Sequence, residues 1–135
     1  MKQIPESLLN TFRKYDTPTI VNSLELLDSK FRTSFFTTEQ MICVDTTLPP
    51  IVGYARTATI SASSEVDPNT KRDRSLAYYE YVSSGTAPFI SVIQDVDESP
   101  GFGAFWGEVN SNIHNALGVI GVVTNGSVRD LDVLS

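Results

Sequence analysis

The sequence predicts an α/β fold that contains a parallel sheet. Strand-like and helical segments alternate over the second half of the 135-residue chain, an order typical of α/β proteins. The segment 119–124, VIGVVT, is a continuous apolar run, as expected of an interior parallel strand. The length suits one domain. We therefore expect a single domain over 1–135, with N-terminal helices at about 5–31 and an α/β core at about 51–135.

Helical patterns dominate the N-terminal part. Apolar residues at helical spacing predict a first helix over 7–15 and a second helix that continues to Phe31. Thr17 followed by Pro18 predicts an N-cap with proline at the first helical position. Residues 35–45 are expected to be extended, and a pair of prolines then ends this part of the chain.

The second half predicts three strands and the helices between them. Residues 51–63 are rich in β-branched and aromatic side chains, which favours a strand. A helix is expected over 73–84, ending at a glycine, and a buried strand over 88–96. Apolar residues from Trp106 to Leu117 recur at helical spacing and predict another helix before the strand VIGVVT.

Charge and composition exclude several classes of function. Ten basic residues stand against sixteen acidic ones, giving a net charge of −6, which argues against nucleic acid as a main partner. The basic cluster of Lys71, Arg72 and Arg74 has acidic neighbours and is interpreted as a solvated helix entry. One cysteine and one histidine, His114, exclude common zinc sites, and His114 is expected to be a partly exposed helix residue.

Membrane association is not expected. No apolar run approaches the roughly 20 residues that span a bilayer, and the N-terminus MKQIPESLLN lacks the apolar core of a signal peptide. A cytoplasmic protein is therefore expected.

A glycine pattern in 101–107 offers weak evidence for nucleotide binding. Its spacing is GxGxxxG, and four residues separate it from the preceding strand, whereas a dinucleotide-binding turn follows its strand directly. We interpret this segment as a flexible loop around Phe102 and Phe105.

The segment NGSVRD, 125–130, is a stronger candidate for a ligand-binding site. It follows a buried parallel strand, where open α/β sheets bind ligands. Arg129 has the planar group that holds a carboxylate through two hydrogen bonds, and Asp130 is a hard oxygen ligand for Mg²⁺ or Mn²⁺. In the alternative, Ser127 caps a last helix, Asp130 stands in its capping box and Arg129 is a surface residue. Both interpretations stay open at this point.

A second candidate segment, 107–110 (GEVN), begins the preceding helix. Glycine allows a ligand close to the backbone, and first-turn amides can bind a carboxylate or carbonyl oxygen. If both helices begin at the same edge of the sheet, Glu108 and Asp130 approach the same cavity.

Together these segments resemble the RraA-like family, which includes 4-hydroxy-4-methyl-2-oxoglutarate aldolases and the RraA regulators of ribonuclease E. The resemblance rests on GAFWGEVNSNIHNALGVIGVVTNGSVRDLDVL, supported by PPIVGYARTATI and TPTIVNSLELL. The aldolases carry an acidic residue, 20 intervening residues and then Arg-Asp, and Glu108 and Arg129-Asp130 have this spacing. The resemblance implies a layered β/β/α, swivelling-domain-like fold.

The resemblance also implies roles for these residues. Substrate would be bound by the backbone of the GEVN segment and by Arg129; the members of that segment are Gly107, Glu108, Val109 and Asn110. Arg129 would hold the pyruvate carboxylate and would be catalytic together with Glu108, which stands where many aldolases have aspartate. Asp130 would bind Mg²⁺ or Mn²⁺.

The activity implied is that of a divalent-metal-dependent lyase. It would cleave 4-hydroxy-4-methyl-2-oxoglutarate-type substrates to pyruvate and would decarboxylate oxaloacetate as a related activity. The alternative is a catalytically silent RraA-like protein that binds and regulates another protein, such as a ribonuclease. Family members form homotrimers or hexamers and continue beyond residue 135, so we expect a homo-oligomer and a fold that is incomplete at the C-terminus.

Overall fold

The computed structural model describes residues 3–34 and 36–133, and its chain divides into two compact units between Val52 and Gly53. The first unit contains the helices α1 (Glu6–Phe12) and α2 (Thr17–Leu27) and a 3₁₀ turn at Ser29–Arg32. The division lies close to the predicted start of the α/β core at about 51. The single domain over 1–135 stays a prediction.

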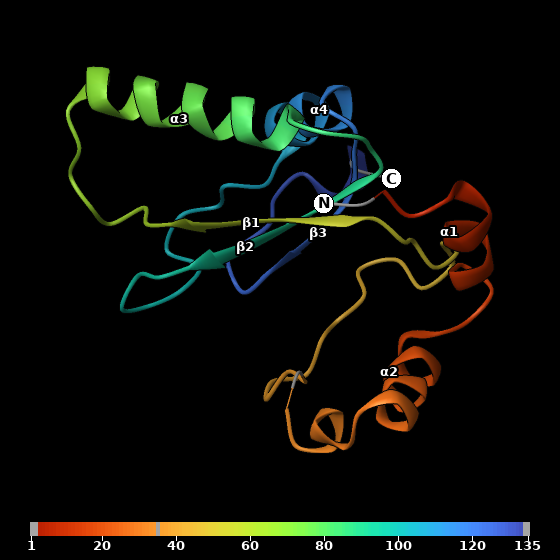
Figure 1. The fold of residues 1–135 in the computed structure, drawn as a ribbon. Coiled ribbons are helices and arrows are strands. Elements are labelled where there is room, and N and C mark those ends of the chain that lie inside the picture. The colour runs from red at the N-terminus through yellow and green to blue at the C-terminus, as the bar shows by residue number, and fades with distance from the viewer. Residues whose placement is uncertain (1–2, 35, 134–135) are drawn as a thin grey trace. The chain divides into compact units, whose positions relative to one another are not determined.

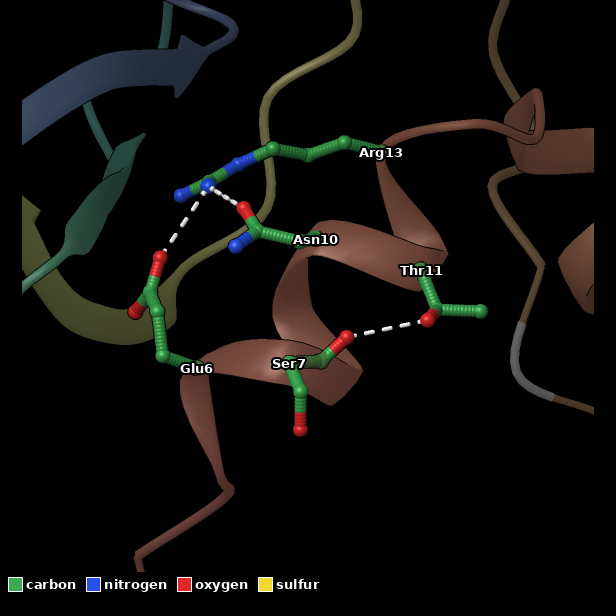
Figure 2. A network of polar contacts seen from close by, with 5 residues as sticks. All are labelled: Glu6, Ser7, Asn10, Thr11 and Arg13. Carbon is green, nitrogen blue, oxygen red and sulfur yellow. Dashed lines mark hydrogen bonds and ion pairs between the residues drawn. The ribbon is translucent and has the colours of Figure 1, made fainter.

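Short-range polar contacts stabilise α1, as Figure 2 shows. The hydroxyl of Thr11 donates a hydrogen bond to the carbonyl oxygen of Ser7, 2.9 Å away. The Arg13 guanidinium donates to the side-chain oxygen of Asn10 and forms an ion pair with Glu6 at 3.3 Å. These contacts are exposed, so each contributes little to stability, about 1 kcal/mol at most.

Aspartate caps account for two differences from the predicted helices. Asp16, rather than Thr17, caps α2 by accepting a hydrogen bond from the Thr19 N–H at 2.9 Å. The predicted continuation to Phe31 is interrupted at Asp28, whose backbone is extended and whose carboxylate accepts from the N–H of the 3₁₀ turn.

Two further N-terminal predictions differ from the structure. The first helix ends at Phe12, before the predicted residue 15. Residues 36–45 form bends and irregular segments and contain no strand, so the predicted extended segment does not join a sheet; Phe35 lies outside the described residues.

The second unit confirms the predicted α/β fold with a parallel sheet. Its elements are, in chain order, β1 (Tyr54–Ile60), α3 (Pro68–Ser83), β2 (Phe89–Asp95), α4 (Glu108–Ala116) and β3 (Val119–Thr124), followed by a 3₁₀ turn at Leu131–Val133. The strands are all parallel in the order β1-β2-β3. Helices α3 and α4 lie on one side of this sheet (Figure 1). The described residues thus supply one sheet and one helical layer.

Helix α3 begins five residues before the predicted start at 73. The Asp67 carboxylate accepts hydrogen bonds from the N–H groups of Asn69 and Thr70, and Pro68 occupies the first turn. This is a strong N-terminal signal, and it outweighs the polar character of the residues that follow.

The apolar core joins the helical layer to the sheet. Val82 of α3, Phe89 of β2 and Val119 of β3 are buried together. Tyr54, Tyr78 and Leu117 pack against them. In the described ranges, 3–34 and 36–133, no helix has the length and apolar character needed to cross a membrane.

A buried chain of hydrogen bonds connects the helical layer to the sheet. His114 is only 1% exposed, which contradicts the expected partly exposed position. Its Nδ1 contacts the Asn110 carbonyl oxygen at 2.6 Å and therefore carries the ring proton, because a carbonyl only accepts. Nε2 then accepts from the Tyr78 hydroxyl at 2.8 Å, and Tyr78 accepts in turn from the Ser91 hydroxyl at 3.1 Å. Burial lowers the pKa of His114, so the neutral ring is favoured.

A second polar cluster joins the loops that follow β1 and β2. The buried Asp97 carboxylate accepts hydrogen bonds from the N–H groups of Ala62 and Ser63 and from the hydroxyls of Ser61 and Ser63. The Ser61 and Ser63 hydroxyls in particular lower the pKa of Asp97 to about 2. The charged carboxylate therefore holds these two loops together at the carboxyl edge of the sheet.

We expect Tyr78→Phe to destabilise the protein by about 1–3 kcal/mol, because the substitution leaves buried acceptor and donor groups of His114 and Ser91 without their partner. Urea unfolding followed by circular dichroism measures the effect. Tyr81→Phe is the control: it deletes the same hydroxyl from a tyrosine that is 41% exposed and accepts a hydrogen bond from the Thr57 N–H. Equal losses of unfolding free energy in the two variants would contradict the buried chain of hydrogen bonds.

Asp97→Asn should destabilise the protein at pH 5, since the amide is uncharged and keeps one acceptor oxygen where the carboxylate uses two to accept four hydrogen bonds. The native pKa lies below its ordinary value, so the carboxylate stabilises the fold above pH 3.8, and this contribution is lost as the pH falls through about 2. The difference in unfolding free energy between wild type and variant should shrink over that range. A difference that stays constant from pH 5 to pH 2 would disprove the assignment, and Asp73→Asn on the exposed part of α3 is the control.

Candidate functional site

The two candidate segments lie side by side at the carboxyl edge of the sheet. Residues 107–110 follow the loop after β2, and 125–130 follow β3 directly. Trp106 and Val128 form an isolated parallel bridge, and the Arg129 N–H donates to the Trp106 carbonyl oxygen at 3.0 Å. The structure therefore brings the two segments into contact, although the cavity that Glu108 lines is not lined by Arg129 or Asp130.

Gly107 makes this close approach possible. A Cβ atom at this position would lie 2.7 Å from the Asp130 Oδ2 atom and 2.9 Å from both Cγ and Nε of Arg129. Any other residue would displace the Asp130 and Arg129 side chains from these positions. Glycine is required here for space, since its backbone is extended and allowed for every residue.

Asp130 caps α4 from the neighbouring segment. Its Oδ2 accepts a hydrogen bond from the Glu108 N–H at 3.2 Å and lies 3.7 Å from the Arg129 Nε. The backbone of Asp130 has a φ of 61°, in the left-handed region that aspartate and asparagine tolerate better than most residues. The carboxylate stabilises the positive end of the helix dipole in this position.

The predicted last helix after Ser127 is wrong, and so is the place of Asp130 in its capping box. The Ser127 hydroxyl donates to the Gly101 carbonyl oxygen at 2.7 Å, and the chain reaches only a 3₁₀ turn at Leu131–Val133. The capping interpretation was correct for the chemistry of Asp130 but assigned it to the wrong helix. Capping and ligand binding are compatible, because the Arg129 and Asp130 side chains remain 68% and 45% exposed.

The first turn of α4 presents backbone donors at the same place. The first intrahelical hydrogen bond is donated by the Ser111 N–H to the Gly107 carbonyl oxygen at 2.9 Å. The N–H groups of Val109 and Asn110 precede this bond in the chain and belong to the first turn, where a helix leaves its backbone donors without intrahelical partners. This geometry suits an oxygen atom of an anionic ligand.

The side chains of this turn face different surroundings. The Asn110 amide accepts from the Tyr79 hydroxyl and donates to the Phe105 carbonyl oxygen, so it holds α4 to α3 and to the preceding loop. Val109 is exposed. Glu108 is also exposed and lines a cavity of about 410 Å³ beside α4 and β3.

Sequence reasoning missed the residues that hold the two loops in place. Buried Asp95 accepts from the N–H groups of Asp97 and Gly101, the latter at 2.7 Å. The Asn125 amide exchanges two hydrogen bonds with the backbone of Asp95. Both residues stand at strand ends, where a polar side chain with a short reach can bridge adjacent loops. That position is the signal that could have found them.

Trp106 also differs from its predicted place. It precedes α4 instead of lying in the apolar stripe of that helix, and it is buried. Its ring lies 4.4 Å from that of His114 between centroids. Within the described ranges, its indole Nε1 is the buried side-chain polar atom that has no hydrogen-bond partner.

The acidic side chains at this edge suit a hydrated hard cation better than a closed metal cage. No group of three or more His, Cys, Asp or Glu side chains that could hold a metal occurs among residues 3–34 and 36–133. Asp130 nevertheless presents a partly exposed carboxylate. Mg²⁺ commonly keeps several waters and needs only one or two protein carboxylates, so the donor chemistry fits such an ion.

Comparison with known proteins agrees with the resemblance seen in the sequence. A family model described as RraA-like, Aldolase/RraA, matches residues 17–135, which include both candidate segments and the whole sheet. Searches of the curated proteins and of the solved structures found no match. The family match, over most of the chain and with the α/β fold it requires, shows that this chain belongs to the RraA-like family.

Proposed function

We propose that this chain is a divalent-metal-dependent lyase that cleaves 4-hydroxy-4-methyl-2-oxoglutarate-type substrates to pyruvate and also decarboxylates oxaloacetate. The observation that carries the proposal is the position of Arg129 and Asp130 against the first turn of α4, at the edge of a parallel sheet where ligands bind. Membership of a family that includes aldolases supports it.

Arg129 would bind the carboxylate of the 2-oxo acid. Its backbone is fixed by the hydrogen bond to Trp106, while most of its side chain is free to meet a ligand. The planar guanidinium can donate two parallel hydrogen bonds to a carboxylate, which orients the 2-oxo group relative to the protein. The same positive charge favours the enolate that forms when the carbon–carbon bond breaks.

The first turn of α4 would bind a second part of the substrate. The N–H groups of Val109 and Asn110 point out of the helix start and carry its partial positive charge. The exposed Glu108 carboxylate stands on the same turn and is our candidate to accept the proton of the substrate hydroxyl.

Asp130 would hold the metal ion, Mg²⁺ or Mn²⁺. The bound ion would supply positive charge for the developing enolate oxygen. Asp130 keeps its capping bond to the Glu108 N–H and so fixes the carboxylate relative to α4.

The direct test measures pyruvate release from both substrates by purified protein with Mg²⁺ or Mn²⁺, before and after EDTA. Matched reactions that contain the metal but no protein correct for metal-catalysed decarboxylation of oxaloacetate. We expect protein-dependent release that EDTA abolishes and added metal restores. Release equal to the metal-only reaction would contradict the proposal and favour the alternative, a silent family member that binds another protein.

We expect Arg129→Lys to lower kcat/KM by about tenfold or more, because lysine keeps the charge but loses the planar pair of donors. Arg72→Lys, on exposed α3, is the matched control and should leave kcat/KM unchanged. Steady-state kinetics with either substrate measure the effect. Unchanged kcat/KM in Arg129→Lys would remove this residue from the site.

Asp130→Asn should weaken Mn²⁺ binding at least about tenfold while changing stability by less than about 1 kcal/mol. The amide removes the negative charge that a hard cation requires. Asparagine also caps helices and tolerates the left-handed backbone at this position. Calorimetric titration with Mn²⁺ in the presence of pyruvate measures the affinity, and Asp132→Asn in the adjacent 3₁₀ turn is the control. Equal affinities in wild type and Asp130→Asn would exclude Asp130 as a ligand.

A further inference from the structure

A second cavity, of about 480 Å³, lies beside α3 and is lined by none of the candidate site residues. Its walls come from the end of β1 and the loop after it, from α3, and from the loop before Trp106. Ile60, Ile93 and Phe105 give it an apolar surface. This volume can hold a small metabolite.

Two cations occupy the cavity side of α3. Lys71, Arg74, Ser75 and Tyr78 all line the cavity, and their spacing places them on one face of the helix. In an α/β protein the sheet-facing stripe of a helix is normally apolar. Among the described residues of α3, only Val82 near its C-terminal end is buried. Lys71 and Arg74 are exposed, so the N-terminal half of this face presents positive charge to the cavity from its solvent side.

Neither cation forms an ion pair with another described residue. Within the described ranges, Lys71 and Arg74 take part in none of the ion pairs, which all lie elsewhere. Arg72, which stands between them in the sequence, does not line the cavity. All three residues of the basic cluster are exposed, as expected of a solvated helix entry, but Lys71 and Arg74 also line the cavity.

Four of the hydroxyl groups that line the cavity, those of Ser61, Ser64, Ser75 and Tyr78, direct their protons into the protein. Ser75 donates to the Lys71 carbonyl oxygen, and Tyr78 donates to His114. Ser61 donates to the Asp97 carboxylate, so the Ser64 hydroxyl must be the donor in its contact with Ser61. These four hydroxyls can offer a ligand only acceptor lone pairs. The ammonium and guanidinium groups are the charged donors that remain.

We propose that this cavity is a binding site for a small amphipathic organic anion, a carboxylate or phosphate ester with an apolar body. The acidic group is held by Lys71 and Arg74, and the apolar part lies against Ile60, Ile93 and Phe105. An oxyanion provides the acceptors that the two cations require. The apolar wall favours a ligand that also has a hydrocarbon part to bury. This site is independent of the proposed lyase activity.

Calorimetric titration with four probes tests whether binding requires both the anionic group and the apolar body of the ligand. Benzoate and phenyl phosphate carry a ring and an anionic group, benzyl alcohol carries the ring alone, and inorganic phosphate carries the charge alone. We expect at least one of the two aromatic anions to bind at least tenfold more tightly than both single-feature probes, and the tighter one identifies the acidic group preferred. Benzyl alcohol or inorganic phosphate binding as tightly as both aromatic anions would overturn the proposal, as would the absence of any binding.

Substitutions on α3 locate the binding. Arg74→Gln should weaken the tighter aromatic anion at least tenfold, and adding Lys71→Gln should weaken it further. Arg72→Gln removes the same charge from the same helix outside the cavity and should change the affinity less than twofold. All three residues are exposed, so the variants should unfold at the wild-type temperature, which circular dichroism checks.

Two results of these substitutions would overturn the proposal. One is an equal loss in Arg72→Gln and Arg74→Gln, which would indicate a diffuse charge effect. The other is a loss of probe binding in Arg129→Lys, which would place the anion in the candidate active site. Failure of the lyase assay alone leaves the cavity titration unaffected, so the two proposals fail separately.

Discussion

The arrangement of this molecule at its candidate site depends on one close contact, in which the segment after β3 lies directly on the backbone before α4. The hydrogen bond from the Arg129 N–H to the Trp106 carbonyl oxygen fixes the separation of the two segments at 3.0 Å. The absence of a side chain at Gly107 leaves room for the Arg129 and Asp130 side chains beside it. Because this contact sets the place of Asp130, it also determines how α4 begins.

The same contact concentrates opposite charges in a small volume. The Asp130 carboxylate meets a helix start, which is partly positive, and lies near the Arg129 guanidinium, yet both side chains remain substantially exposed. The capping hydrogen bond from the Glu108 N–H keeps this carboxylate in a fixed direction. Such pre-positioned charges favour ligand binding because little reorganisation is needed when the ligand arrives.

The sequence predicted the strands and the overall order of elements well, because apolar runs such as VIGVVT depend on burial, which the fold must satisfy. Helix ends were predicted less well. The starts at Thr17 and Pro68 were set by aspartate caps at Asp16 and Asp67, a local signal that was present in the sequence but weighed too little.

The errors around the candidate site have a different cause. Asp130 and Ser127 satisfy partners that are 22 and 26 residues away in sequence, at Glu108 and Gly101. A capping signal read locally therefore predicted a helix that does not form. His114 was misplaced for the same reason, since its buried position depends on a hydroxyl of Tyr78 from another helix. Spacing in the sequence suggested which residues belong together, but only the sheet brings them into contact.

The position of Trp106 gives this protein a built-in optical reporter. It is the one tryptophan in the chain, so ultraviolet emission excited at the red edge of protein absorption originates from a single indole. That indole is buried, packs against the rings of His114 and Phe105, and belongs to the residue whose carbonyl holds Arg129. Changes in the separation of the two segments therefore alter the surroundings of this fluorophore, and the state of the site becomes readable without any attached label.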